Sequence, residues 1–165
     1  MSNNEAEKKL NEAKQKSAIV YYEKTKELKE KLSELNEMID TDLKIDVNNL
    51  IEASTATSRL HSKYLALLSE YRLKAIECEC RYDMALQERI RYYAGKDSSI
   101  KCQMILTSAE AKSYAEADKD IIALRILSES TVAVLDVIKR TLESLKQRGY
   151  DIKNIIDWKK FEAGY

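Results

Sequence analysis

The chain contains no proline and only three glycines in 165 residues, so very little in it can interrupt a helix. Proline removes a backbone hydrogen-bond donor, and glycine is the residue that most often ends a helix. Apolar residues make up 44 % of the chain and charged residues 34 %, a mixture typical of long amphipathic helices. The sequence therefore predicts an all-α fold, an elongated and coiled-coil-like protomer of four to five helices.

The net charge is zero, with 28 basic and 28 acidic side chains, so an anionic partner would have to be bound by local patches. Residues 59–101 carry nine basic and six acidic side chains, and residues 139–160 carry seven and three. The N-terminus is polar rather than typical of a targeting segment, and no apolar run approaches the ~20 residues of a membrane span. We expect a cytoplasmic protein that does not contact membranes.

Hydrophobic periodicity divides the chain into three regions. Residues 1–33 are predicted to be a polar helical extension, residues 34–96 a region built on one long helix, and residues 97–165 a second helical region. Asp46 is the expected N-cap of a helix that runs to Tyr93, and Gly95 is placed to end that helix in the left-handed conformation.

Two seams of positions spaced alternately by three and four follow the predicted long helices. The first covers residues 50–85, and the second belongs to a last long helix from Asp118 to Gly149, after which a short terminal helix is expected. Two such seams expose more apolar surface than one chain covers alone, which favours a cyclic homo-oligomer. The residues expected to be buried between subunits are Leu135, Ile138, Leu142 and Leu145.

The sequence offers little for catalysis. His61 is the single histidine, and it falls in the first seam, where a buried structural role is favoured over a general base. No glycine-rich phosphate loop is present. Cys78 and Cys80 make a poor zinc chelate, because residues two apart on a helix face different directions. We expect a protein that is not an enzyme and uses no metal or cofactor.

The most informative stretch lies at the end of the predicted central helix. Positive side chains there can track a phosphate backbone, and adjacent aromatic rings can stack on unpaired bases without sequence preference. The structural alternative is that basic residues complement the helix dipole and that the tyrosines pack in a core or an interface. The candidate DNA-binding residues are Arg81, Arg89, Arg91, Tyr92, Tyr93 and Lys96.

A second basic run spreads over the end of the chain. We interpret it as a solvated face beside the second seam, in preference to a DNA contact. Its members are Lys139, Arg140, Lys146, Arg148, Lys153, Lys159 and Lys160.

Three motifs stand out along the chain: Ala85–Lys96, Ala117–Asp120 and the ending from Lys146 to Gly164. The first resembles the Leu-Lys-x-Arg-Leu-Asp-Tyr-Tyr-Ser-Gly stretch of the UvsY recombination mediators of T-even-type phages. The second resembles that family's Ala-Asp-Lys-Asp, and the third its Arg-Gly-Phe-x-Ile-Lys-x-Ile and Phe-Glu-Ala-Gly tail. The motifs occur in the family's order, and the resemblance covers the chain from about residue 34 onward.

The resemblance implies a helical protein that assembles through its C-terminal part into rings of six or seven subunits. It also implies binding to single-stranded DNA, which we expect in residues 34–96, and oligomerisation in residues 97–165. It further implies that the hold of the phage single-strand-binding protein on DNA is weakened and that a RecA-like recombinase is loaded in the infected bacterial host. The family's DNA contact is ascribed to the Lys and Arg of its first motif, which correspond here to Gln87 and Arg89. Arg91 stands where the family has Asp, so it is expected to replace the missing lysine charge.

A structural coiled-coil protein, such as a virion scaffold or assembly adaptor that binds no nucleic acid, is the main alternative. Neutral net charge and heptad seams are ordinary features of that class. Salt-sensitive binding to a labelled oligonucleotide separates the two hypotheses.

Overall fold

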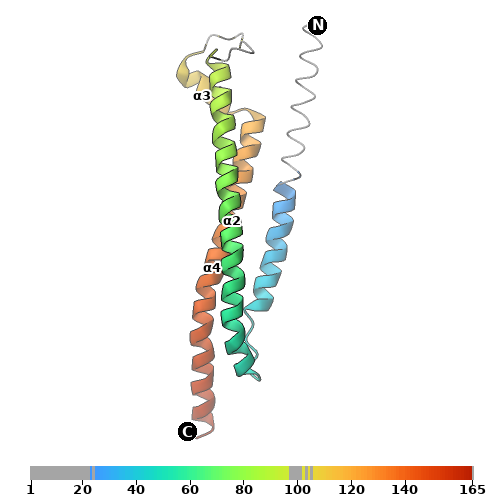
Figure 1. The fold of residues 1–165 in the computed structure, drawn as a ribbon, viewed down its shortest axis with the longest axis vertical. Coiled ribbons are helices and arrows are strands. Elements are labelled where there is room, and N and C mark those ends of the chain that lie inside the picture. Colours follow the sequence, from blue (N-terminus) through green and yellow to red (C-terminus); the bar gives the residue numbers. More distant parts are fainter. Residues whose placement is uncertain (1–22, 24, 97–101, 103, 105, 165) are drawn as a thin grey trace. The chain divides into compact units, whose positions relative to one another are not determined.

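The computed structural model describes residues 23, 25–96, 102, 104 and 106–164. Within these residues all regular structure is helical: a helical segment over residues 25–42, α2 over Leu50–Tyr93, α3 over Ser108–Glu116 and α4 over Lys119–Glu162 (Figure 1). The predicted all-α fold is therefore confirmed, with four helices. Most of the predicted N-terminal extension, residues 1–33, lies outside the described residues. No described helix combines the length and apolar character needed to cross a bilayer.

The chain packs into two compact units. One, which we call the α3 unit, contains Lys74–Thr131, and the other, which we call the Tyr64 unit, contains Glu30–Leu73 and Val132–Tyr165. Both α2 and α4 contribute to each unit, so the units do not follow the sequential division at residues 33 and 96. The assignment of DNA binding and oligomerisation to those sequential regions stays a prediction.

The core of the Tyr64 unit lies where the first part of α2 runs beside the last part of α4 (Figure 1). Tyr64 is fully buried, and its hydroxyl donates to Asp42 Oδ2 at 3.0 Å, which ties the N-terminal helical segment to α2. Burial and this carboxylate raise the pKa of Tyr64 well above its ordinary value. The buried residues that α4 contributes are Val134, Leu135, Ile138, Thr141, Leu142, Leu145, Arg148 and Ile152.

The first predicted seam is also present in the structure. The seam has eleven positions between Leu50 and Ala85. Ten of them, including His61, are buried or half-buried, and Ser54 is exposed. The start of α2 differs from the prediction, because Asp46 Oδ1 accepts the backbone N–H of Asn48 at 2.9 Å in the preceding turn. Asn49 is the cap instead, and its Oδ1 accepts the backbone N–H of Glu52 at 3.2 Å.

The predicted helix end at Gly149 is wrong, because α4 continues without a break to Glu162. A glycine inside a helix costs about 1 kcal/mol relative to alanine. Burial of Leu145 and Ile152 on either side outweighs that cost, since each apolar side chain gains about 1.5–3 kcal/mol from full burial. The seam continues past the glycine at the same spacing.

Candidate nucleic-acid interface

The end of α2 is shaped by a Schellman motif. Gly95 has a φ of 67°, its N–H donates to the carbonyl of Tyr92 at 3.0 Å, and the N–H of Lys96 donates to the carbonyl of Arg91 at 2.9 Å. The predicted left-handed glycine is therefore confirmed. This turn folds the backbone of Lys96 against the last turn of α2, so two exposed cationic residues, Arg91 and Lys96, share that end of the helix.

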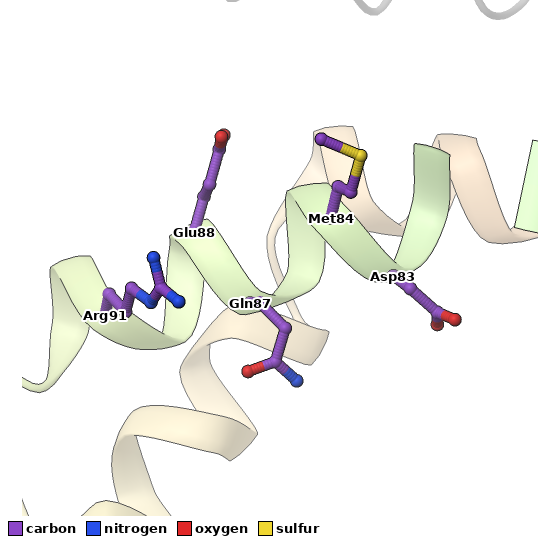
Figure 2. A pocket seen from close by; sticks show the side chains of 5 residues that line it. All are labelled: Asp83, Met84, Gln87, Glu88 and Arg91. Carbon is purple, nitrogen blue, oxygen red and sulfur yellow. The ribbon is translucent and has the colours of Figure 1, made fainter. Parts of the chain in front are cut away.

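Arg91 and Gln87 are exposed on the same side of α2, one turn apart. Figure 2 shows them with Asp83, Met84 and Glu88, and these five described residues line a hollow of about 330 Å³. Arg91 makes no ion pair with any described residue. However, two carboxylates outnumber the one guanidinium in the hollow, so the hollow itself does not favour phosphate. The attraction for an anion lies toward the helix end, where Lys96 adds its charge.

Arg89 has a different environment from the one expected of a phosphate ligand. Its Nε lies 3.2 Å from Asp118 Oδ2, and its Nη2 lies 3.2 Å from Asp120 Oδ2. The Arg89 side chain is 26 % exposed, and those of the two aspartates are 11 % and 19 % exposed. The first and second sequence motifs thus contact each other, and the guanidinium is already engaged by protein carboxylates.

Arg81 lies two turns before Arg89 and is exposed. It forms an ion pair with Glu77, one turn earlier on the same helix. Exposed pairs of this spacing contribute only about 0.3–0.5 kcal/mol, so a phosphate could compete for Arg81 at little cost.

Tyr92 and Tyr93 belong to an aromatic cluster that α3 completes. The ring centroids of Tyr92 and Tyr93 are 5.1 Å apart in an edge-to-face arrangement, and those of Tyr93 and Tyr114 are 5.8 Å apart. Burial and the nearby Asp118 raise the pKa of Tyr93 above its ordinary value. Tyr92 and Tyr93 are half-buried, whereas Tyr114 is 48 % exposed and offers the most open ring.

Tyr114 is a candidate that the sequence did not reveal. The start of α3 is a capping box, in which Glu110 N–H donates to Thr107 Oγ1 at 3.3 Å and Thr107 N–H donates to Glu110 Oε2 at 2.8 Å. The hydrogen bonds from Thr107 lower the pKa of Glu110 below its ordinary 4.5. This box is readable from the sequence, but nothing local indicates that Tyr114 meets the tyrosines of α2.

Arg148 was placed in the solvated basic run, and that interpretation is wrong. Only 5 % of Arg148 is exposed, and its guanidinium donates to the carbonyls of Ala53 at 2.7 Å and Lys44 at 3.2 Å and to Thr57 Oγ1. The sequence does contain a signal for the burial of Arg148, because Leu145, Arg148 and Ile152 continue the spacing of the second seam. The rest of the run is exposed: Lys139, Arg140, Lys146, Lys153, Lys159 and Lys160.

The four residues expected between subunits are buried inside the single chain. Ile138 and Leu145 are 0 % and 1 % exposed, and Leu135 and Leu142 are also buried in the Tyr64 unit. Their burial therefore needs no second subunit, and their role in assembly stays a prediction. Apolar side chains that a second subunit could cover are found elsewhere in the same unit: Ile51, Leu73, Trp158 and Phe161.

A family model described as "Recombination, repair and ssDNA binding protein UvsY" matches residues 38–165. The chain belongs to the UvsY family. Recombination protein uvsY of Enterobacteria phage T4 is 30 % identical over 135 residues, which cover 81 % of this chain and 98 % of the relative.

The fold of the UvsY family is shared as well. Two crystal structures of the bacteriophage T4 recombination mediator protein UvsY match with TM-scores of 0.74 and 0.73, at 29 % and 28 % identity. The matches cover 79 % and 78 % of this chain and 98 % of each T4 chain. The resemblance read from the three motifs is therefore confirmed. The description of the UvsY family names recombination, repair and single-stranded DNA binding. Binding to DNA disfavours a purely structural scaffold.

Proposed function

We propose that this chain binds single-stranded DNA as a ring-like homo-oligomer in the cytoplasm of an infected bacterium. In that form it loads a RecA-like recombinase onto strands covered by single-strand-binding protein. The observation that carries the proposal is membership of a family described as single-stranded-DNA-binding recombination and repair proteins. The end of α2 supplies a suitable surface, where the cations of Arg91 and Lys96 lie near the Tyr92–Tyr93–Tyr114 cluster.

One such surface binds weakly, because it offers few cations and has carboxylates nearby. Six or seven copies in a closed oligomer raise the overall affinity by orders of magnitude without any new contact. A strand held by many weak contacts can be bent away from the single-strand-binding protein. The recombinase can then displace the contacts one at a time, which suits a loading factor better than one tight site would.

Replacing both Arg91 and Lys96 with alanine should flatten the salt dependence of DNA binding. On single strands the slope of log K against log salt concentration is about 0.7 per phosphate contact, so the loss of two contacts lowers it by about 1.4 per bound subunit. Fluorescence anisotropy of a labelled oligothymidylate over a salt series measures this slope. Lys139→Ala is the matched control, because Lys139 is exposed in the Tyr64 unit and pairs with Asp136.

An unchanged slope in the double variant would place the DNA site elsewhere. Loading is tested separately, by the ATP hydrolysis of a RecA-like recombinase on an oligonucleotide covered with single-strand-binding protein. The wild-type chain should stimulate hydrolysis, and the double variant should not. Wild-type chain that binds DNA without stimulating the recombinase would contradict the loading role alone.

Tyr114→Ala should weaken binding to the same oligonucleotide by about 1 kcal/mol or more, because each base that stacks on an aromatic ring gains about 1–3 kcal/mol. Tyr114→Phe keeps the ring and should bind as the wild type does. Neither variant removes a charge, so the salt slope should not change. Tyr150→Ala, at an exposed tyrosine of the Tyr64 unit, is the control. Equal affinity of Tyr114→Ala and wild type would remove α3 from the interface.

A further inference from the structure

We infer that Arg89 is a positioning residue and not a phosphate ligand: with Asp118 and Asp120 it clamps the last turns of α2 to the start of α4. The clamp holds Arg91, Tyr92 and Tyr93 where a strand can meet them. This inference rests on the proposed function, because it assigns roles within the proposed DNA-binding surface.

The geometry uses the Arg89 guanidinium as a fork. Nε and Nη2 each approach a different carboxylate at 3.2 Å, so the two aspartates together occupy one edge of the planar group. Arginine suits this role because its donors are fixed in one plane, whereas a lysine ammonium is a single point of charge. Asp118 immediately precedes α4 and Asp120 lies in its first turn, so the contact joins the end of α2 to the start of α4.

Recruiting Arg89 to a phosphate would require both ion pairs to break. Asp118 and Asp120 are less exposed than Arg89 itself, so they would lose this cation while staying largely out of water. Removing one partner of a buried charge pair is costly chiefly because the other charge stays desolvated. Arg91 and Lys96 are exposed and can turn to a phosphate without that cost.

Asp118 cannot follow an arginine that moves away, because it also starts α4. Its Oδ1 accepts the backbone N–H of Asp120 at 3.1 Å, and its carbonyl accepts the N–H of Ile122 at 2.9 Å. Both carboxylates lie at the N-terminal end of α4, where the helix dipole favours negative charge. The first turn of α4 thus holds the two aspartates in place, and the aspartates hold Arg89.

The clamp acts where the proposed DNA-binding groups begin. Tyr92 and Tyr93 follow Arg89 by about one helical turn, and Tyr93 contacts Tyr114 of α3. The end of α2, α3 and the start of α4 therefore meet at one place within the α3 unit. Loss of the clamp frees the end of α2 to shift against α3, which would separate Arg91 and Lys96 from the Tyr114 ring.

A double-mutant cycle on DNA affinity tests the assignment. Arg89→Gln should weaken binding of a labelled oligothymidylate about fivefold, a coupling of the size found between contacting residues. In a chain that already carries Asp118→Asn and Asp120→Asn, the same change should matter about twofold or less, because no clamp remains. The salt slope should stay the same throughout. The cycle cancels the general effect of removing two negative charges near DNA.

A phosphate ligand would behave in the opposite way. Arg89→Gln would then lower the DNA affinity of the double asparagine variant at least as much as that of the wild type. In both backgrounds the salt slope would fall by about 0.7. Arg89→Lys separates the roles again: a phosphate ligand tolerates lysine, whereas a forked clamp does not, so we expect Arg89→Lys to bind nearly as weakly as Arg89→Gln. Arg140→Gln, at an exposed arginine of the Tyr64 unit, is the matched control.

The same cycle measured by thermal unfolding without DNA judges the clamp independently. Arg89→Gln should lower the melting temperature of the wild-type chain and leave that of the double asparagine variant nearly unchanged. If the wild-type chain fails to bind the oligonucleotide, the proposed function falls while this measurement still decides on the clamp. Equal losses of melting temperature in the wild-type and double asparagine backgrounds would overturn the clamp.

Discussion

Leu142→Asp should lower the free energy of unfolding by about 4 kcal/mol or more, and it should remove helical structure rather than release intact subunits. Leu142 is 8 % exposed in the core of the Tyr64 unit, where an ionised carboxylate is strongly disfavoured. If only the mass of the oligomer were measured, this unfolding would be mistaken for dissociation. Urea unfolding followed by circular dichroism, together with light scattering, separates the two results.

Leu65→Asp is the matched control, because Leu65 lies in the same unit and is 42 % exposed. The identical substitution there should change the free energy of unfolding by about 0.5 kcal/mol or less. A Leu142→Asp chain that kept its helix content and melting temperature but had a lower mass would show that Leu142 is buried between subunits after all.

Arg148→Met should lower the free energy of unfolding by about 3 kcal/mol. Methionine keeps much of the buried apolar stem, but it removes the guanidinium that donates to Lys44, Ala53 and Thr57. Arg148→Lys should restore little, because one ammonium cannot reach acceptors spread over the start of α2 and the turn before it. Denaturant unfolding of the two variants measures both effects.

Lys146→Met provides the comparison, since Lys146 is an exposed residue of the same helix. Its unfolding free energy should match that of the wild type within about 0.5 kcal/mol. If Arg148→Met were equally neutral, the buried guanidinium would contribute nothing that a packed apolar side chain cannot replace, as happens for some buried ion pairs.

Features of the fold that depend on neighbours in sequence were predictable. The left-handed Gly95 follows from short-range backbone requirements and is found as predicted, and the Thr107–Glu110 box obeys rules of the same kind. The same kind of rule failed at Gly149, because it considered only the cost of glycine and not the burial on either side. A local rule holds where no long-range packing opposes it.

The candidate site was predicted less well, because its decisive contacts join residues far apart in the sequence. Arg89 and Asp120 are 31 positions apart, and Arg148 is 95 positions from Ala53. A list of basic residues at the end of a helix cannot distinguish a cation that faces solvent from one already neutralised by another helix. Arg89 and Arg91 look equivalent in sequence, and only their surroundings in the folded chain tell them apart.

The continuity of α2 and α4 through both compact units has a consequence for how the protein can change. No loop between residues 73 and 74 or between 131 and 132 offers a place to cut, because each junction lies within a continuous helix. Neither unit is therefore a module that can be excised, duplicated or exchanged with another protein. Variation at the end of α2 has to proceed by single substitutions, which leave both continuous helices intact.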